Sequence, residues 1–148
     1  MQKRRELMAQ TNEPLLSVKG LKQYFPVSKK FTVRAVDNIS FDIYPGETYG
    51  LVGESGSGKS TTGRSIIRLY DPTEGTILFN GEDISKKLTA KQEKMLRSDM
   101  QMVFQDPMAS LNPHKKILDT IAMGLDAHHP HMDQKERVER VSKMMEMV

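Results

Sequence analysis

Apolar and polar residues alternate over long parts of the chain, with the period of strands that have one buried face. This alternation, rich in β-branched residues, predicts strands at residues 15–21, 32–43, 48–52, 76–79 and 100–104. The turn pairs Pro45-Gly46 and Asn80-Gly81 separate some of these segments, and Asn-Gly is a strong hairpin signal. Strands are therefore expected at intervals as far as residue 104.

Helical segments lie between the later predicted strands and make up the C-terminal part of the chain. They are predicted at residues 60–70, 89–98, 116–126 and 133–148. The first is expected to stop at Asp71-Pro72, because a residue before proline disfavours helix. Thr89 is a suitable N-cap for the second, with Glu93 near the position that supports such a cap. Strands mixed with helices predict an α/β chain.

Composition narrows the classes of protein that the chain can represent. Hydrophobic residues make up 37% and charged residues 28%, which is typical of a soluble globular chain. The net charge of +3 comes from scattered basic residues without a broad basic stripe, so no nucleic-acid partner is expected. The absence of cysteine excludes disulfides and thiolate metal sites.

The N-terminal residues and the hydropathy of the chain bear on its relation to membranes. Residues 1–13 are expected to form a polar, disordered tail, which lacks the apolar stretch of a secretory signal. No apolar run approaches the roughly 18 residues that are needed to span a bilayer. The chain is therefore not expected to cross a membrane by itself.

A glycine-rich segment after residue 52 carries the clearest chemical signal. It matches G-x-x-x-x-G-K-[ST] and continues with a threonine: Gly53, Glu54, Ser55, Gly56, Ser57, Gly58, Lys59, Ser60 and Thr61. Glycines permit positive φ and bring backbone N–H groups close to a phosphate, and the following helix adds its positive N-terminal end. Lys59 is expected to reach the β- and γ-phosphates, and Ser60 is expected to bind Mg²⁺. The segment predicts a nucleoside triphosphate site.

Two polar segments each admit a second interpretation. A glycine-serine hinge between domains would account for residues 53–58, but a hinge has no need of Gly-Lys-Ser followed at once by a helix. The histidines of "AHHPHMD", residues 127–133, suggest a metal site, but no carboxylate or cysteine spacing fixes a coordination geometry. A polar loop between two helices is the expected structure there.

Two stretches, "GLVGESGSGKSTTGRSIIRLYDPTEGTILFNGEDI" and "QMVFQDPMASLNP", closely resemble the ATP-binding subunits of ABC transporters. Within that family "SLNP" is similar to the oligopeptide/dipeptide importer branch. The resemblance implies a P-loop NTPase core with an N-terminal antiparallel β subdomain and the start of the helical subdomain. It implies that residues 14–148 are the N-terminal portion of such a domain, truncated, with the core reaching about residue 105 and the Q-loop and helical subdomain following.

The resemblance also implies roles for individual residues. Tyr24 occupies the position of an aromatic that stacks on adenine, although Phe25 or no stacking role at all remain alternatives. Gln105 matches the Q-loop glutamine, which contacts Mg²⁺ and the attacking water and is therefore a candidate catalytic and metal-binding residue. Thr61 matches a position whose hydroxyl meets the α-phosphate.

Cofactors and partners follow from the same resemblance. The family binds ATP with Mg²⁺, and its subunits form head-to-tail dimers with a second ATP-binding subunit. They dock on transmembrane permease subunits at the cytoplasmic side of the cell membrane as peripheral proteins. The expected function is ATP binding, and in the complete subunit ATP hydrolysis, to energise the import of oligopeptides or dipeptides.

Further catalytic parts of the family are not found in these 148 residues. They are the L-S-G-G-Q signature, an apolar run ending in Asp-Glu, and a later switch histidine. Glu82 and Asp83 follow an apolar segment, but an Asn-Gly turn intervenes. This chain alone is therefore expected to bind ATP without hydrolysing it. Two alternatives stay open: a regulatory P-loop module without turnover, and a small complete NTPase that uses Asp106 to hold Mg²⁺.

Overall fold

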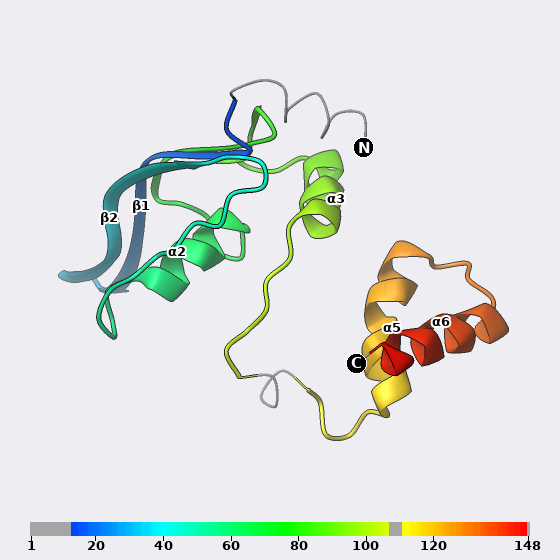
Figure 1. The fold of residues 1–148 in the computed structure, drawn as a ribbon. Helices are drawn as coiled ribbons and strands as arrows, with labels where there is room; N and C mark the ends of the chain where they lie inside the picture. Colours follow the sequence, from blue (N-terminus) through cyan, green and yellow to red (C-terminus); the bar gives the residue numbers. More distant parts are fainter. Residues whose placement is uncertain (1–12, 107–110, 148) are drawn as a thin grey trace. The chain divides into compact units, whose positions relative to one another are not determined.

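The computed structural model describes residues 13–106 and 111–147, so the predicted N-terminal tail lies almost entirely outside the described residues. The chain divides into two compact units, Met1–Met102 and Val103–Val148 (Figure 1). Each unit has its own secondary structure and its own buried residues, and each is described by itself.

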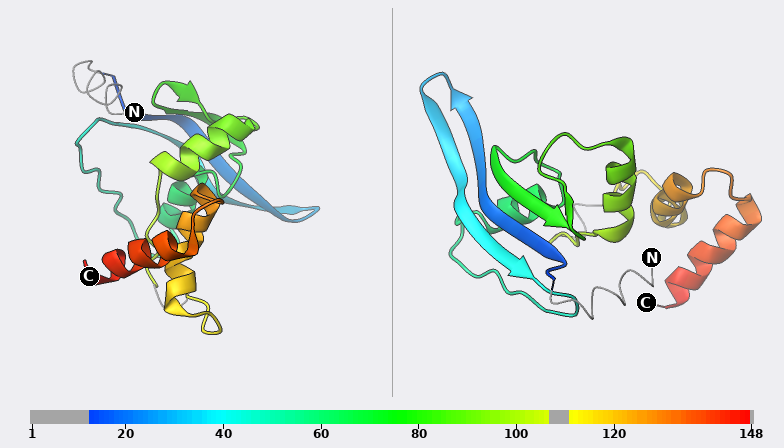
Figure 2. Two further views of the ribbon diagram at one scale, coloured as in Figure 1. Left: turned by 90° about the vertical axis from the view of Figure 1, so that its right-hand side faces the viewer. Right: turned by 90° about the horizontal axis from the view of Figure 1, so that it is seen from above.

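The first unit contains a four-stranded antiparallel sheet with the order β2-β1-β3-β4. Its strands are β1 (Leu16–Ser28), β2 (Phe31–Ile43), β3 (Glu74–Phe79) and β4 (Glu82–Asp83). The two long strands form a hairpin that extends beyond the rest of the sheet (Figure 2). Asn80 and Gly81, with φ of 52° and 75°, form the turn between β3 and β4, as the Asn-Gly signal predicts. The predicted antiparallel β subdomain is therefore confirmed.

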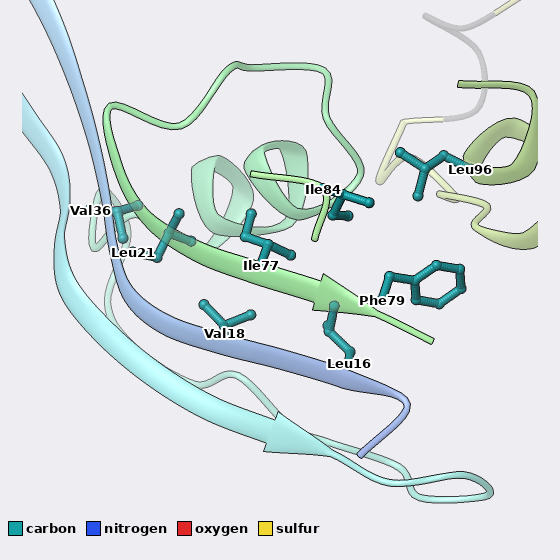
Figure 3. Packing of buried hydrophobic residues seen from close by; sticks show 8 residues of the cluster. All are labelled: Leu16, Val18, Leu21, Val36, Ile77, Phe79, Ile84 and Leu96. Atoms are coloured by element: carbon teal, nitrogen blue, oxygen red, sulfur yellow. The ribbon is translucent and has the colours of Figure 1, made fainter. Parts of the chain in front are cut away.

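Apolar side chains from these strands and from the segments after them form the core of the first unit (Figure 3). Val18, Leu21, Ile77 and Ile84 are fully buried, and α3 contributes Leu96. Val18 and Leu21 are three positions apart on β1, and the strand pairing is irregular between them. This irregularity allows both side chains to enter the core, although the side chains of a regular strand alternate between two faces.

Two helices, α2 (Lys59–Ile66) and α3 (Ala90–Asp99), complete the described part of the first unit. α2 ends earlier than the predicted residue 70, because Arg68 has a φ of 60° that a right-handed helix cannot continue. The Arg68 side chain is buried and donates hydrogen bonds to the carbonyls of Ile84 and Ser85. These hydrogen bonds thus take the place of the last helical turn that the sequence predicts.

The start of α3 confirms one capping prediction and corrects another. Thr89 is the N-cap, and its side chain accepts a hydrogen bond from the backbone N–H of Gln92. The reciprocal partner of the capping box is Gln92 and not Glu93. Gln92 occupies the third helical position, whereas Glu93 is one residue too far along the helix to reach back.

Two predicted strands, at residues 48–52 and 100–104, are wrong. Both segments are described, but they form no ladder with β1–β4. Val52 is 93% exposed and Val103 is 96% exposed, although each has the apolar character of a buried strand residue. A strand forms only where a neighbour satisfies its backbone hydrogen bonds, and the described part of the chain supplies none to either segment.

In the residues described, the second unit contains a pair of helices, α5 (Ile117–His128) and α6 (Gln134–Glu146). Their bounds lie within two residues of the predicted ranges. Ala122 and Val141 are its buried apolar residues among those described. Arg137 of α6 donates two hydrogen bonds to Asp126 of α5, at 2.8 and 3.0 Å. These bonds hold the pKa of Asp126 below its ordinary value. None of the helices in the two described ranges is long and apolar enough to cross a membrane.

Candidate functional site

The glycine-rich loop packs against β2 in the first unit. Gly56 and Gly58 have φ of 80° and 88°, values that favour glycine strongly. A Cβ on Gly58 would lie 2.2 Å from the carbonyl oxygen of Ala35, which is well inside the contact distance of any real pair. The loop therefore reaches β2 only because position 58 carries no side chain.

The N-terminus of α2 leaves backbone donors available beside this loop. Gly58 is the N-cap and supplies no side-chain acceptor, and the first turn of this fully described helix contains no acidic residue. The first intrahelical acceptor is the Gly58 carbonyl, to which the Thr62 N–H donates at 2.8 Å. The preceding N–H groups point out of the helix start, where the macrodipole favours an anion.

A shallow pocket of about 250 Å³ lies between the loop and β2. Its lining comes from both elements: Val33, Arg34, Ala35, Gly56, Ser57, Gly58, Lys59, Ser60 and Thr61. The structure thus places residues 56–61, the second half of the predicted loop, around one pocket. The residues from β2 were missed by sequence reasoning, since strand residues carry no motif of their own. The one usable signal is the Gly58 position, which requires close contact with another segment.

Lys59 lies across the loop. Its Nζ donates to the carbonyl oxygens of Gly53 and Glu54, at 2.8 and 2.6 Å, and to Ser57 Oγ at 3.3 Å. An ammonium group with three donors can exchange such contacts for phosphate oxygens at little cost in geometry. Hydrogen bonds to the loop therefore hold Lys59, which lines the pocket where it is predicted to bind phosphate.

Tyr24 lies on β1 directly opposite Arg34 of β2. Its hydroxyl donates to Asp37 Oδ1 at 2.5 Å, and this hydrogen bond raises the pKa of Tyr24. The Arg34 guanidinium carbon lies 5.5 Å from the centre of the Tyr24 ring. Tyr24 is thus connected through Arg34 to the pocket beside the loop.

Phe25, the alternative aromatic, has a different environment. Its ring packs edge-on against Tyr70, with centroids 5.3 Å apart and an interplanar angle of 83°. This contact gives Phe25 a packing role within the first unit. The geometry supports Tyr24 over Phe25 as the residue near the pocket, and its stacking on adenine stays a prediction.

Gln105 and Asp106 belong to the second unit and are exposed. The glycine-rich loop belongs to the first unit, so the roles of Gln105 and Asp106 at the nucleotide stay predictions. The histidines at residues 128–131 line a separate pocket with Glu136 and Arg140. Glu136 accepts a hydrogen bond from Arg140 at 2.6 Å, and within the described ranges no group of three histidine or carboxylate side chains is arranged to hold a metal.

The sequence model of the ABC transporter family matches residues 36–148. The chain belongs to the ABC transporter family. This match covers the second half of β2, the whole glycine-rich loop and all of the second unit, and it confirms the resemblance on which the sequence interpretation depends.

Several relatives within the ABC transporter family carry descriptions of peptide transport. The oligopeptide transport ATP-binding protein OppF of Bacillus subtilis (strain 168) is 56% identical over 136 residues, 92% of this chain and 44% of the relative. The dipeptide transport ATP-binding protein DppF of Lactococcus lactis subsp. cremoris (strain MG1363) is 46% identical, over 90% of this chain and 43% of the relative. The chain therefore spans less than half the length of these relatives.

A solved structure supports the fold of this ABC family member. The ATP-binding cassette MJ0796, in a dimeric post-hydrolysis state bound to ADP and Pi, matches with a TM-score of 0.76 and 26% sequence identity. The match covers 89% of this chain and 56% of that chain. The predicted fold class, a P-loop core with an N-terminal antiparallel sheet and helices, is confirmed by this likeness.

Proposed function

We propose that this chain binds Mg-ATP at residues 53–61 and belongs to a subunit that uses ATP to drive the import of oligopeptides or dipeptides. The observation that carries the proposal is the pocket in which Lys59, the start of α2 and the positive-φ glycines converge. The peptide-transport names of the relatives support the cargo class.

Each residue of the loop has a distinct part in the proposed site. The backbone N–H groups at the start of α2 bind the β-phosphate, and Lys59 neutralises the β- and γ-phosphates. Ser60 Oγ binds Mg²⁺, and Thr61 Oγ1 donates to the α-phosphate. Ser60 and Thr61 line the same pocket as Lys59, which supports these assignments. In the complete subunit, Gln105 contacts Mg²⁺ and the attacking water.

The proposed partners follow from the membership of this chain in the ABC transporter family. The solved cassette MJ0796 is described as a dimer, which supports a second ATP-binding subunit as a partner. Transmembrane permease subunits are the second class of partner, and they place the protein at the cytoplasmic side of the membrane.

Adenine stacking on Tyr24 predicts a specific mutational pattern. Tyr24→Ala is expected to weaken ATP binding by about 1–3 kcal/mol, the range seen when a base loses its aromatic platform. Tyr24→Phe is expected to bind nearly as well as the parent, because it keeps the ring and loses only the hydrogen bond to Asp37. Fluorescence titration with ATP measures both. A loss in Phe25→Ala instead of Tyr24→Ala would assign the stacking to Phe25.

Turnover separates the proposal from the small-NTPase alternative. The 148-residue chain with Mg-ATP is expected to release phosphate no faster than its Lys59→Ala variant. Phosphoryl transfer is catalysed by charged and polar groups held in position around the phosphates. The Asp-Glu pair, the signature and the switch histidine of the family are not found in these 148 residues, and without them the rate is expected to be lower by several orders of magnitude. Phosphate release well above this control, abolished by Asp106→Asn, would replace the proposal with a complete enzyme that uses Asp106.

A further inference from the structure

Arg34 is the cationic side chain of the pocket that the glycine-rich motif does not contain. It lies on β2, next to Ala35, whose carbonyl oxygen approaches the Gly58 position. This close approach fixes the distance between the Arg34 backbone and the loop. Arg34 and Lys59 are the two basic residues that line the pocket, one from the strand and one from the loop.

The contacts of Arg34 orient it without consuming its donors. Its guanidinium covers the ring of Tyr24, with 5.5 Å from the guanidinium carbon to the ring centre. It also pairs with Asp37 at 4.0 Å, and both side chains are largely exposed, at 69% and 48%. An exposed pair at this distance contributes little to stability. Arg34 is one of the residues that line the pocket, and its five N–H donors have the capacity to bind an incoming anion.

We propose that Arg34 is a nucleotide-binding residue that donates to an α-phosphate oxygen of the bound nucleotide. The inference rests on the proposed function, because it assumes that the pocket holds ATP. Tyr24 marks the predicted position of the base, and the loop marks that of the β- and γ-phosphates. The ribose and the α-phosphate connect the two in any nucleotide. Arg34 lines the pocket, and its guanidinium lies over the Tyr24 ring, so this residue is near both ends of the connection.

Chemistry favours the phosphate as its acceptor over the ribose. A guanidinium binds anionic oxygens with charge-assisted hydrogen bonds, which are about twice as strong as neutral ones. The contact with Tyr24 places the guanidinium beside the predicted position of the base. A base that stacks on this face of Tyr24 then displaces the guanidinium toward the α-phosphate.

The test compares Arg34→Gln with the parent chain by calorimetric titration with ATP and with ADP. Both affinities are expected to fall by the same factor, about tenfold or more, because both nucleotides carry the α-phosphate and a charge-assisted bond is removed. Lys30→Gln, which removes the same charge at the exposed β1–β2 turn, is the matched control and is expected to bind like the parent. Unchanged affinity in Arg34→Gln, or a loss confined to ATP, would overturn the proposal.

A second variant separates phosphate binding from packing on the tyrosine. Arg34→Lys is expected to recover affinity to within about threefold of the parent, because an ammonium still contacts a phosphate oxygen as a point charge. Equal losses in Arg34→Lys and Arg34→Gln would assign Arg34 to packing on Tyr24 and overturn the proposal. If Lys59→Ala loses ATP binding while Arg34→Gln does not, the inference fails and the proposed function stands. If the parent chain binds neither nucleotide, both fail together.

Discussion

Replacement of Lys59 by alanine is expected to weaken Mg-ATP binding by at least about a hundredfold, the equivalent of two charge-assisted hydrogen bonds. The Lys59 ammonium lies at the pocket and donates to loop oxygens, two carbonyls and one hydroxyl. Because these oxygens are uncharged, the ammonium gains more from a phosphate oxygen than it gives up by leaving them. Removing the ammonium leaves the β- and γ-phosphates without the positively charged side chain that the loop supplies to them.

The matched control for this variant is Lys30→Ala, which removes the same charge from an exposed turn. It is expected to bind Mg-ATP like the parent, since Lys30 is not among the residues that line the pocket. Circular dichroism of Lys59→Ala checks that the fold stays in place without the hydrogen bonds from the lysine to the loop. Equal Mg-ATP affinity in Lys59→Ala and the parent, by calorimetry, contradicts the assignment of the loop as the phosphate site.

Gly58→Ala is expected to lower the free energy of unfolding by about 3 kcal/mol or more, and to abolish nucleotide binding. The left-handed conformation at φ 88° alone costs a non-glycine residue about 1–2 kcal/mol. The added methyl group would also meet the Ala35 carbonyl at 2.2 Å, and the residues of β2 on either side of Ala35 are paired with β1, which limits how far this carbonyl can move. The loop must then withdraw from β2, which opens the pocket. Urea denaturation measures the change in unfolding free energy.

Gly56→Ala is the control that separates the cost of the left-handed backbone conformation from the cost of the steric clash with Ala35. Gly56 has a nearly equal φ of 80°, but a Cβ there would meet nothing within 4 Å. This variant is expected to lose only the conformational contribution of about 1–2 kcal/mol. Equal destabilisation by the two alanines would show that the contact between Gly58 and β2 is not what holds the loop.

The sequence predicts those elements whose signals are local. The β3–β4 turn follows from Asn-Gly, and α3 begins at its predicted cap, Thr89. The glycine-rich loop is identifiable because its chemistry requires particular residues at fixed spacing. In each of these cases the residues that determine the structure lie within a few positions of one another.

The secondary-structure predictions that are wrong concern segments whose structure depends on residues far away in the sequence. The segments at 48–52 and 100–104 have the composition of buried strands, but a strand depends on a partner that composition does not specify. α2 stops early because Arg68 turns back to bind the carbonyls of Ile84 and Ser85, on a segment that follows it by many residues. The sequence gives no sign of Arg34 for the same reason, since only the folded hairpin brings it to the loop.

Hydrogen–deuterium exchange of the 148-residue chain, with and without Mg-ATP, tests the central claim most directly. Mg-ATP is expected to slow exchange at the backbone amides of residues 53–61, where N–H groups are expected to bind phosphate. No such change is expected in Lys59→Ala. The histidine-lined pocket at residues 128–132 serves as an internal reference and is expected to exchange at the same rate in both conditions. Unchanged exchange at residues 53–61 in the parent chain, at Mg-ATP concentrations in the millimolar range, would contradict the account.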